Sequence, residues 1–403
     1  MDLSGMNRII KVDRKNRMAI VEPGVTFGQL QPEAVKEGLK LSLPLLPRAS
    51  KSVMTSVLER EPVMVPKYQW QIIDPLRFLE VVWGGGEILR TGEGGLYPPL
   101  EEGQPLKQTF PMGPLQTDYY RFVSGAQGSM GVVVWAALKC EVLPRIHNFY
   151  FVPAQTPEAL FDFVYKLLRF RYGDELLLMN NVNLAYIVGK TPEQIRALKK
   201  ELPPWICIVG IAGRERLAEE RVEFQQKDIS EIAQQFGLKM LPALSGIAGN
   251  QMAKLLNEPS TEPHWKVRHR GAAQDIFFLT TLDKTPDFVK VVYSVMQAQE
   301  YPSPDAGIYF QPTQQGASCH CEFTFPYDPE DGGDVKRMQR LFSAASEKLV
   351  QQGAYFFRPY GIWAPMTYNR DAQSTMTLMK IKGIFDPNNV MNPGKLFHAI
   401  RSI

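Results

Sequence analysis

Residues 7–31 read NRIIKVDRKNRMAIVEPGVTFGQLQ, and in this stretch two short apolar runs flank the polar link DRKN. That pattern predicts a β-hairpin. Pro23 and Gly24 should end its second strand, because proline presets the first turn position and glycine accepts a positive φ at the next. Thr26 is then placed to cap a helix over FGQLQPEAVKEG, which Gly38 should terminate.

Length and composition set the broad class of protein. The 403 residues favour two domains, and 44% hydrophobic with 22% charged residues is a globular balance. A net charge of +3 excludes the basic stripe that nucleic-acid binding requires. The longest apolar run, Trp205–Ala212, is too short to cross a membrane. The first residues lack the apolar block of a secretory signal, so we expect a cytoplasmic protein whose four cysteines are reduced thiols.

The pattern along the chain predicts an α+β fold. LEVVWGGGEILRT, residues 79–91, should form a hairpin around three glycines, and residues 96–114 should form an irregular surface excursion. After His147 strands alternate with amphipathic helices, which indicates a sheet covered by helices and suggests a duplicated ferredoxin-like unit. The predicted strands there are Phe149–Pro153, Leu176–Val188, Ile206–Ile211, Ile276–Leu282 and Gly307–Phe325. The predicted helices are Pro157–Phe170, Pro192–Glu201, Glu215–Phe236, Pro286–Gln299, Asp334–Gln352 and Asp371–Gly383.

Three segments, taken in order, resemble one enzyme family. They are the opening stretch 7–31, FVSGAQGSMGVVVWAALKCEVLP at 122–144, and IKGIFDPNNVMNPGKLF at 381–397. Together they resemble the FAD-linked oxidoreductases of the vanillyl-alcohol oxidase and p-cresol methylhydroxylase (PCMH) type. The resemblance implies a bipartite PCMH-type FAD-binding domain made of residues 1–146 and a C-terminal strap, 366–403. Residues 147–365 would form a ferredoxin-like cap domain over the substrate.

The resemblance also implies which residues contact FAD. Glycines let backbone amides approach an anionic pyrophosphate, and hydroxyl groups add donors beside it. The implied FAD-binding residues are Pro23, Gly24, Val25, Ser52, Val53, Thr55, Ser56, Gly125, Gln127, Gly128, Met130, Gly131, Val132, Asn392 and Lys395.

One departure from the family concerns the start of the chain. Family members have a further glycine-rich pyrophosphate loop upstream of the segment that matches DLSGMNRI, whereas this chain starts at Met1. We therefore expect weak or no FAD binding by this chain alone, with a separate chain supplying the missing loop as one explanation. The alternative to an enzyme is a non-catalytic subunit that keeps half of a flavin site. An electron-acceptor protein as partner and a homodimer both remain open.

The candidate base lies in GIYFQPTQQGASCHCEFTF, residues 307–325. Alternation along a strand puts His320 and Glu322 on one face and both neighbouring cysteines on the other. Only histidine among these groups titrates near neutrality, so His320 is the predicted proton acceptor, oriented by Glu322 or by Gln311 on the preceding strand. A solvent-facing strand without catalytic duty is the alternative. The same alternation disfavours a Cys-His-Cys metal site, and we predict no metal.

The candidate anion site lies in AYFFRPYGIWAP, residues 354–365. A guanidinium is permanently charged and donates in a planar fork, so Arg358 with Tyr360 should clamp a carboxylate or phenolate of the substrate. Trp363 should help to exclude water. The alternative is an arginine stacked on aromatic rings for structural reasons.

The remaining histidines are interpreted as belonging to surface segments: His264 and His269 to a solvated basic turn, and His147 and His398 to ordinary exposed positions.

Overall fold

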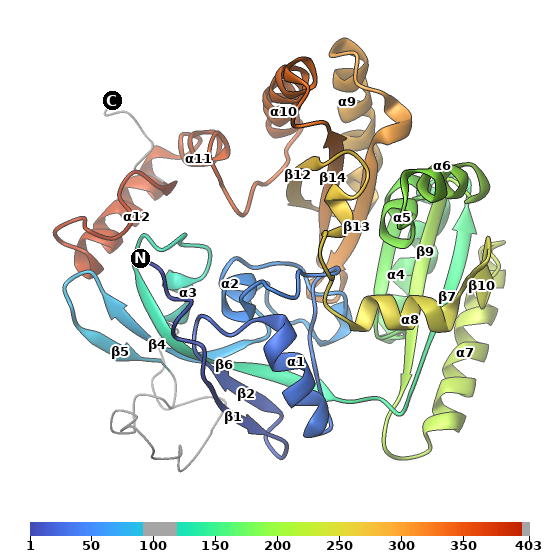
Figure 1. Cartoon of the computed structure of the whole chain (residues 1–403), viewed down its shortest axis with the longest axis horizontal. Coiled ribbons are helices and arrows are strands. Elements are labelled where there is room, and N and C mark those ends of the chain that lie inside the picture. Colours follow the sequence, from blue (N-terminus) through green and yellow to red (C-terminus); the bar gives the residue numbers. More distant parts are fainter. Residues whose placement is uncertain (92–118, 397–403) are drawn as a thin grey trace.

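Two antiparallel sheets form the framework of the protein (Figure 1). The computed structural model describes residues 1–91 and 119–396. The predicted excursion at 96–114 and His398 therefore lie outside the described residues.

The first sheet has the strand order β1-β2-β6-β4-β5, with β3 paired to the far end of β6. Its strands are β1 (Ile9–Asp13), β2 (Met18–Val21), β3 (Leu39–Leu41), β4 (Leu76–Trp83), β5 (Ile88–Arg90) and β6 (Gly131–Val142). The short helices beside it are α1 (Phe27–Lys36), α2 (Val53–Leu58) and α3 (Tyr120–Val123). The long strand β6 joins both of the predicted hairpins into one sheet.

Local sequence signals explain the opening elements of this sheet. The predicted hairpin is confirmed, with Asp13 opposite Met18 at its turn. Thr26 caps α1 and, with Gln29, completes a capping box, which satisfies amide donors at the helix start. Gly38 follows the helix with a φ of +69°, as the predicted stop requires. The hairpin around the three glycines is also confirmed as β4 and β5.

The second sheet has the order β12-β14-β13-β8-β9-β7, and each neighbouring pair is antiparallel. Its strands are β7 (Ile146–Ala154), β8 (Leu176–Asn180), β9 (Trp205–Gly213), β12 (Ala272–Thr280), β13 (Gly307–Thr313) and β14 (Ser318–Tyr327). In each half of the sheet the first strand pairs with the third and the third pairs with the second. The predicted repeat is thus confirmed at the level of topology, and β8 and β13 join the two halves.

Helices cover one face of this sheet completely. They are α4 (Phe161–Phe170), α7 (Ala218–Gln235), α9 (Thr285–Ala298) and α10 (Gly332–Gln351), and their apolar sides share one core with the strands. On the opposite face, α5 (Asn181–Val188) packs against β13 and β8, and α8 (Gly249–Asn257) packs against β7. The same face of β12, β14 and β13 carries polar side chains and borders a cavity.

Two details of the second sheet differ from the sequence prediction. The predicted strand 176–188 is wrong beyond residue 180, because the side chain of Asn180 accepts a hydrogen bond from the Asn183 amide and starts helix α5. The predicted strand 307–325 is interrupted by a turn at Gln314–Gly316, where all three residues have positive φ. α6 (Pro192–Glu201) forms as predicted.

The end of the chain returns to the first sheet. After α11 (Trp363–Tyr368), helix α12 (Ala372–Phe385) lies beside β4, where Phe385 stacks on Trp83 at 4.2 Å. The buried Lys382 donates to the Ser129 carbonyl at 2.6 Å and pairs with Asp386. Asp386 in turn accepts from the amides of the following turn. The tail after α12 is thus the turn-rich strap that Pro387 and Pro393 predict.

Candidate functional site

A cavity of about 590 Å³ lies between the first sheet's loops and the polar face of the second sheet. Its lining comes from residues 44–62, from residues 264–275, from strands β13 and β14, and from Arg358. This volume falls in the range of small-molecule sites. Two of the predicted catalytic residues, His320 and Arg358, line it.

His320 lies on β14 and is fully buried. Its Nε2 is 3.1 Å from Oε2 of Glu322, two positions further along the same face. Cys319 and Cys321 point into the helix-covered core on the other face, so the predicted alternation is confirmed and the solvent-facing alternative is wrong. Burial lowers the pKa of His320; the Glu322 carboxylate opposes this, and the charge of Arg358 adds to it. The imidazole is therefore neutral near pH 7.

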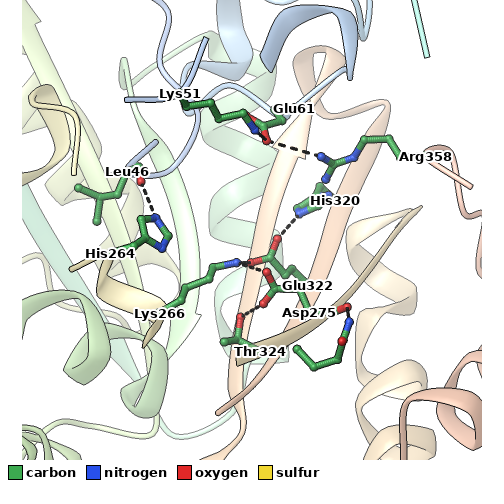
Figure 2. A network of polar contacts seen from close by, with 11 residues as sticks. Leu46, Lys51, Glu61, His264, Lys266, Asp275, His320, Glu322, Thr324 and Arg358 are labelled. Carbon is green, nitrogen blue, oxygen red and sulfur yellow. Dashed lines mark hydrogen bonds and ion pairs between the residues drawn. The ribbon is translucent and has the colours of Figure 1, made fainter. Parts of the chain in front are cut away.

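Glu322 belongs to a buried charge network that Figure 2 shows. Lys266 donates to Glu322 and to Asp275 on β12, at 2.6 Å in each case. Burial alone would raise the pKa of Glu322, but the Lys266 ammonium and the His320 hydrogen bond hold it below its usual range. Burial raises the pKa of Asp275, because Lys266 only partly offsets the loss of water and Glu322 is a like charge.

Arg358 enters the cavity from the segment between α10 and α11 and is 7% exposed. Its guanidinium carbon lies 3.9 Å from the centre of the Phe277 ring and 5.1 Å from that of Phe357. Its Nη1 is 3.8 Å from the Glu61 carboxylate. The arginine is thus both stacked on aromatic rings and part of the cavity lining, so the stacking is confirmed and the anion-binding role stays a prediction.

Glu61 is shared between two cations. Lys51 forms an ion pair with it, and the Ser56 hydroxyl donates to its other oxygen at 2.6 Å. Burial would raise the pKa of Glu61, but Lys51 and Arg358 hold it below the usual value. One carboxylate therefore balances two positive charges at this end of the cavity.

Three predicted residues lie near the cavity without facing it as expected. Gln311 is buried on β13, where it accepts from Tyr309 and donates to the Leu176 carbonyl, so of the two predicted orienting residues it is Glu322 that bonds to His320. Burial raises the pKa of Tyr360, whose hydroxyl is directed to Glu59. Trp363 lies behind Phe277 in the core, and its indole donates to Ser346 at 2.8 Å. Their substrate roles stay predictions.

The predicted FAD-binding residues at the front of the chain contact one another. Ser52 caps α2 and donates to the Pro23 carbonyl at 2.6 Å, and the Val53 amide donates to the Val25 carbonyl. A Cβ on Gly24 would lie 2.6 Å from the Ser4 carbonyl oxygen. A side chain at this position would therefore collide with the N-terminal segment. Thr55 is exposed on α2.

The predicted residues of the second and third segments also lie side by side. Asn392 donates to the Gln127 carbonyl at 2.7 Å, and the Gly125 amide donates to the carbonyl of Leu58, the last residue of α2. Met130 is buried, Gly131 and Val132 open strand β6, and Lys395 is exposed. The second and third segments therefore lie side by side, and the first segment joins the second through the pairing of β2 with β6.

Loop 124–131 has the features of a ligand-binding loop. The Ser129 hydroxyl is buried and has no hydrogen-bond partner in the described part of the chain. A Cβ on Gly128, which has a φ of +71°, would meet only the Asn392 amide nitrogen, at 3.9 Å. Open backbone beside a buried unpaired donor suits an anion such as a pyrophosphate. The residues of this loop, with Asn392, fit FAD.

Sequence reasoning missed several residues of the cavity. The segment at 264–270 is not a solvated turn: His264 bonds the Leu46 carbonyl, burial lowers its pKa to about 4, and Lys266 is the centre of the network. Asp275, Lys51 and Glu61 were also not singled out. The interpretation of His147 as an exposed residue is likewise wrong, because it is held by Glu175 and Asn257. A charged residue beside tryptophan in EPHWKV was the only signal for Lys266.

Comparison with known proteins finds two matching domain families. Residues 1–92 match the FAD binding domain family, and residues 360–396 match the C-terminal domain of FAD linked oxidases. The two ends of the chain therefore match domains of FAD-linked oxidoreductases, and the fold is that of the PCMH type. A solved structure of p-cresol methylhydroxylase with bound substrate superposes with a TM-score of 0.80 at 18% identity, covering 99% of this chain and 79% of that one.

Two further proteins are similar to this chain in sequence. D-2-hydroxyglutarate dehydrogenase of Stutzerimonas stutzeri (strain A1501) is 22% identical over 98% of this chain and 80% of its own length. The 4-cresol dehydrogenase [hydroxylating] flavoprotein subunit of Pseudomonas putida is 34% identical over 24% of this chain and 18% of its own. Among the described helices, none has the length and apolar character needed to cross a membrane.

Proposed function

We propose that this chain oxidises a small hydroxy acid, alcohol or phenol, with FAD as hydride acceptor, and that it favours a substrate that carries a negative charge. The observation that carries the proposal is the neutral, buried His320 bonded to Glu322 in a cavity that also holds Arg358. FAD, when bound, accepts the hydride. Loop 124–131 and Asn392 are the residues proposed to hold it, together with the segments around Pro23 and Ser52.

The chain's own side chains would bind the substrate and manage one proton. Arg358 and Lys51 together exceed the charge of Glu61, so a carboxylate or phenolate is favoured between them. From a hydroxy acid or an alcohol, the hydride leaves the carbon that carries the hydroxyl, and the proton of that hydroxyl passes to His320. From a 4-alkylphenolate, the hydride leaves the benzylic carbon and no proton has to be accepted. Phe277 and Phe357 keep water from the guanidinium, which strengthens its attraction for the anion.

We extend the proposal to partners and compartment. A further subunit and a protein that accepts electrons from the flavin are the proposed partners. The cytoplasm remains the proposed compartment, supported by four buried cysteines that are all free thiols.

The test measures FAD uptake and dye reduction with the full chain. Flavin fluorescence is titrated first with the chain alone and then with the product of the gene immediately upstream. Dye reduction is then followed with 2-hydroxy acids, benzylic alcohols and 4-alkylphenols, using methyl esters of the acids as matched neutral controls. Reduction by an anionic substrate and not by its ester is expected. Flavin uptake without reduction by any class would contradict the proposal and favour a non-catalytic flavin-binding subunit; no uptake in either preparation would remove FAD itself.

A further inference from the structure

Lys266 has no role in the proton transfer just described, yet it forms ion pairs with two carboxylates of the cavity. It comes from the 3-10 turn Trp265–Val267, and its side chain is largely buried against Asp275 and Glu322. Asp275 and Glu322 lie on neighbouring strands β12 and β14 with side chains on one face, because Asp275 is opposite Thr324 and Phe277 is opposite Glu322. Figure 2 shows the ammonium between the two carboxylates.

The oxygens of Glu322 are divided between two partners. Oε1 accepts from Lys266 at 2.6 Å, and Oε2 lies 3.1 Å from His320 Nε2. An ionised carboxylate can only accept hydrogen bonds. While Glu322 is ionised, Nε2 of His320 must therefore carry the proton, and Nδ1 keeps the free electron pair.

Lys266 is what keeps Glu322 ionised. Two carboxylates buried side by side without a cation would share a proton, since like charges in a dry site cannot both persist. A protonated Glu322 could donate to Nε2, and the imidazole would then carry its proton on Nδ1. In that tautomer the nitrogen that remains free for a substrate would be the donor and not the acceptor.

We propose that Lys266 is a positioning residue that fixes the tautomer of His320 through Glu322, leaving Nδ1 as the proton acceptor. His320 Nδ1 is buried and has no partner within the described residues, as a nitrogen reserved for a substrate proton would be. The charged and titratable groups around the imidazole are Glu322 on its own strand, Tyr309 on β13, Arg358 from the segment before α11, and Lys266 beneath Glu322. This inference rests on the proposed function, in which His320 is the base.

The test reads the tautomer directly by ¹⁵N NMR of histidine-labelled full-length protein near pH 7, without turnover. The chain has only five histidines, so His320 can be assigned with H320N as reference. Wild type and Lys266→Arg, which keeps a cation between the carboxylates, should show the proton on Nε2. Lys266→Met should move it to Nδ1 and reduce kcat about tenfold to a hundredfold, with KM little changed. Lys200→Met, at an exposed position of α6, is the matched control.

The outcomes separate this inference from the proposed function. An unchanged tautomer in Lys266→Met would overturn the role of Lys266, whatever the activity. A changed tautomer with unchanged turnover would support the role of Lys266 and would instead remove His320 as the base. If Lys266→Met does not fold, Lys266→Gln takes its place, because it keeps a hydrogen-bond donor between the carboxylates but removes the charge, and the same two outcomes decide.

Discussion

The two ends of the cavity use the same three-group arrangement with opposite charge. At the end near α2, the cations Lys51 and Arg358 share the single carboxylate of Glu61. At the end on the second sheet, the carboxylates of Asp275 and Glu322 share the single ammonium of Lys266. Each group is buried or partly buried, so an unbalanced charge acts over a short distance with little screening.

This difference indicates what each end does. An excess cation can bind the anionic part of a substrate throughout the reaction, because a guanidinium does not lose its proton. An excess anion beside a neutral histidine stabilises the imidazolium that forms when a proton arrives. The cavity therefore has a binding end and a proton-accepting end, and substitutions at the two ends should affect different kinetic constants.

The largest effect is expected from His320→Asn, which removes the proton acceptor. We expect kcat to fall about a hundredfold to ten-thousandfold, the usual contribution of a general base, with little change in KM. Steady-state dye reduction measures it. His269→Asn is the matched control, since His269 stacks on Tyr186 and does not line the cavity. A fall in both variants would point to a general loss of structure.

A smaller effect is expected at the binding end from Arg358→Lys. The charge remains, but the planar fork and its stacking on Phe277 are lost, so KM for an anionic substrate should rise roughly tenfold to a hundredfold while kcat changes little. The corresponding neutral ester should show no such rise. Arg370→Lys, at an exposed position, serves as control. Equal loss for the acid and the ester would remove Arg358 as the anion site.

How much of this could be predicted from the sequence differs between the fold and the cavity. The hairpins, the cap of α1 and most helices follow from local signals such as Thr26 and Gly38, whose effects are confined to neighbouring residues. The change from strand to helix at Asn180 depends on one side-chain hydrogen bond that competes with an apolar run. A short continuous apolar run can form a buried strand or part of a buried helix, so periodicity does not decide between them.

The site was predictable only where strand alternation sufficed. His320 and Glu322 share a strand, so two-residue spacing alone places them together. Lys266 and Asp275 join them through pairing between β12 and β14 and through a short turn, and no local pattern encodes that contact. Arg358 was selected for its aromatic neighbours in sequence, whereas the ring on which it stacks most closely, Phe277, comes from a distant strand.

The pH dependence of turnover links the two ends. Because His320 must be neutral to accept a proton and its pKa lies below the usual value, kcat/KM should be level near neutrality and fall only toward acid. The positive charge of Arg358 contributes to this lowering. Arg358→Met should therefore move the acidic limb to higher pH, and Arg358→Lys should leave it in place. Identical limbs in both variants would show that the two ends act independently.

The smallest effect is expected on stability, from Glu61→Gln. Loss of the carboxylate leaves Lys51 and Arg358 facing each other with only a neutral acceptor, which should cost about 1–3 kcal/mol in the free energy of unfolding near pH 7. The pKa of Glu61 is lowered in the folded protein, so its contribution is complete above the unfolded value of 4.5 and is lost as pH falls through the folded value. Urea unfolding should thus show a difference between wild type and variant that shrinks in acid. Glu347→Gln, on the exposed side of α10, should show no such difference at any pH. A pH-independent loss would mean that packing around Glu61, and not its charge, holds this end of the cavity together.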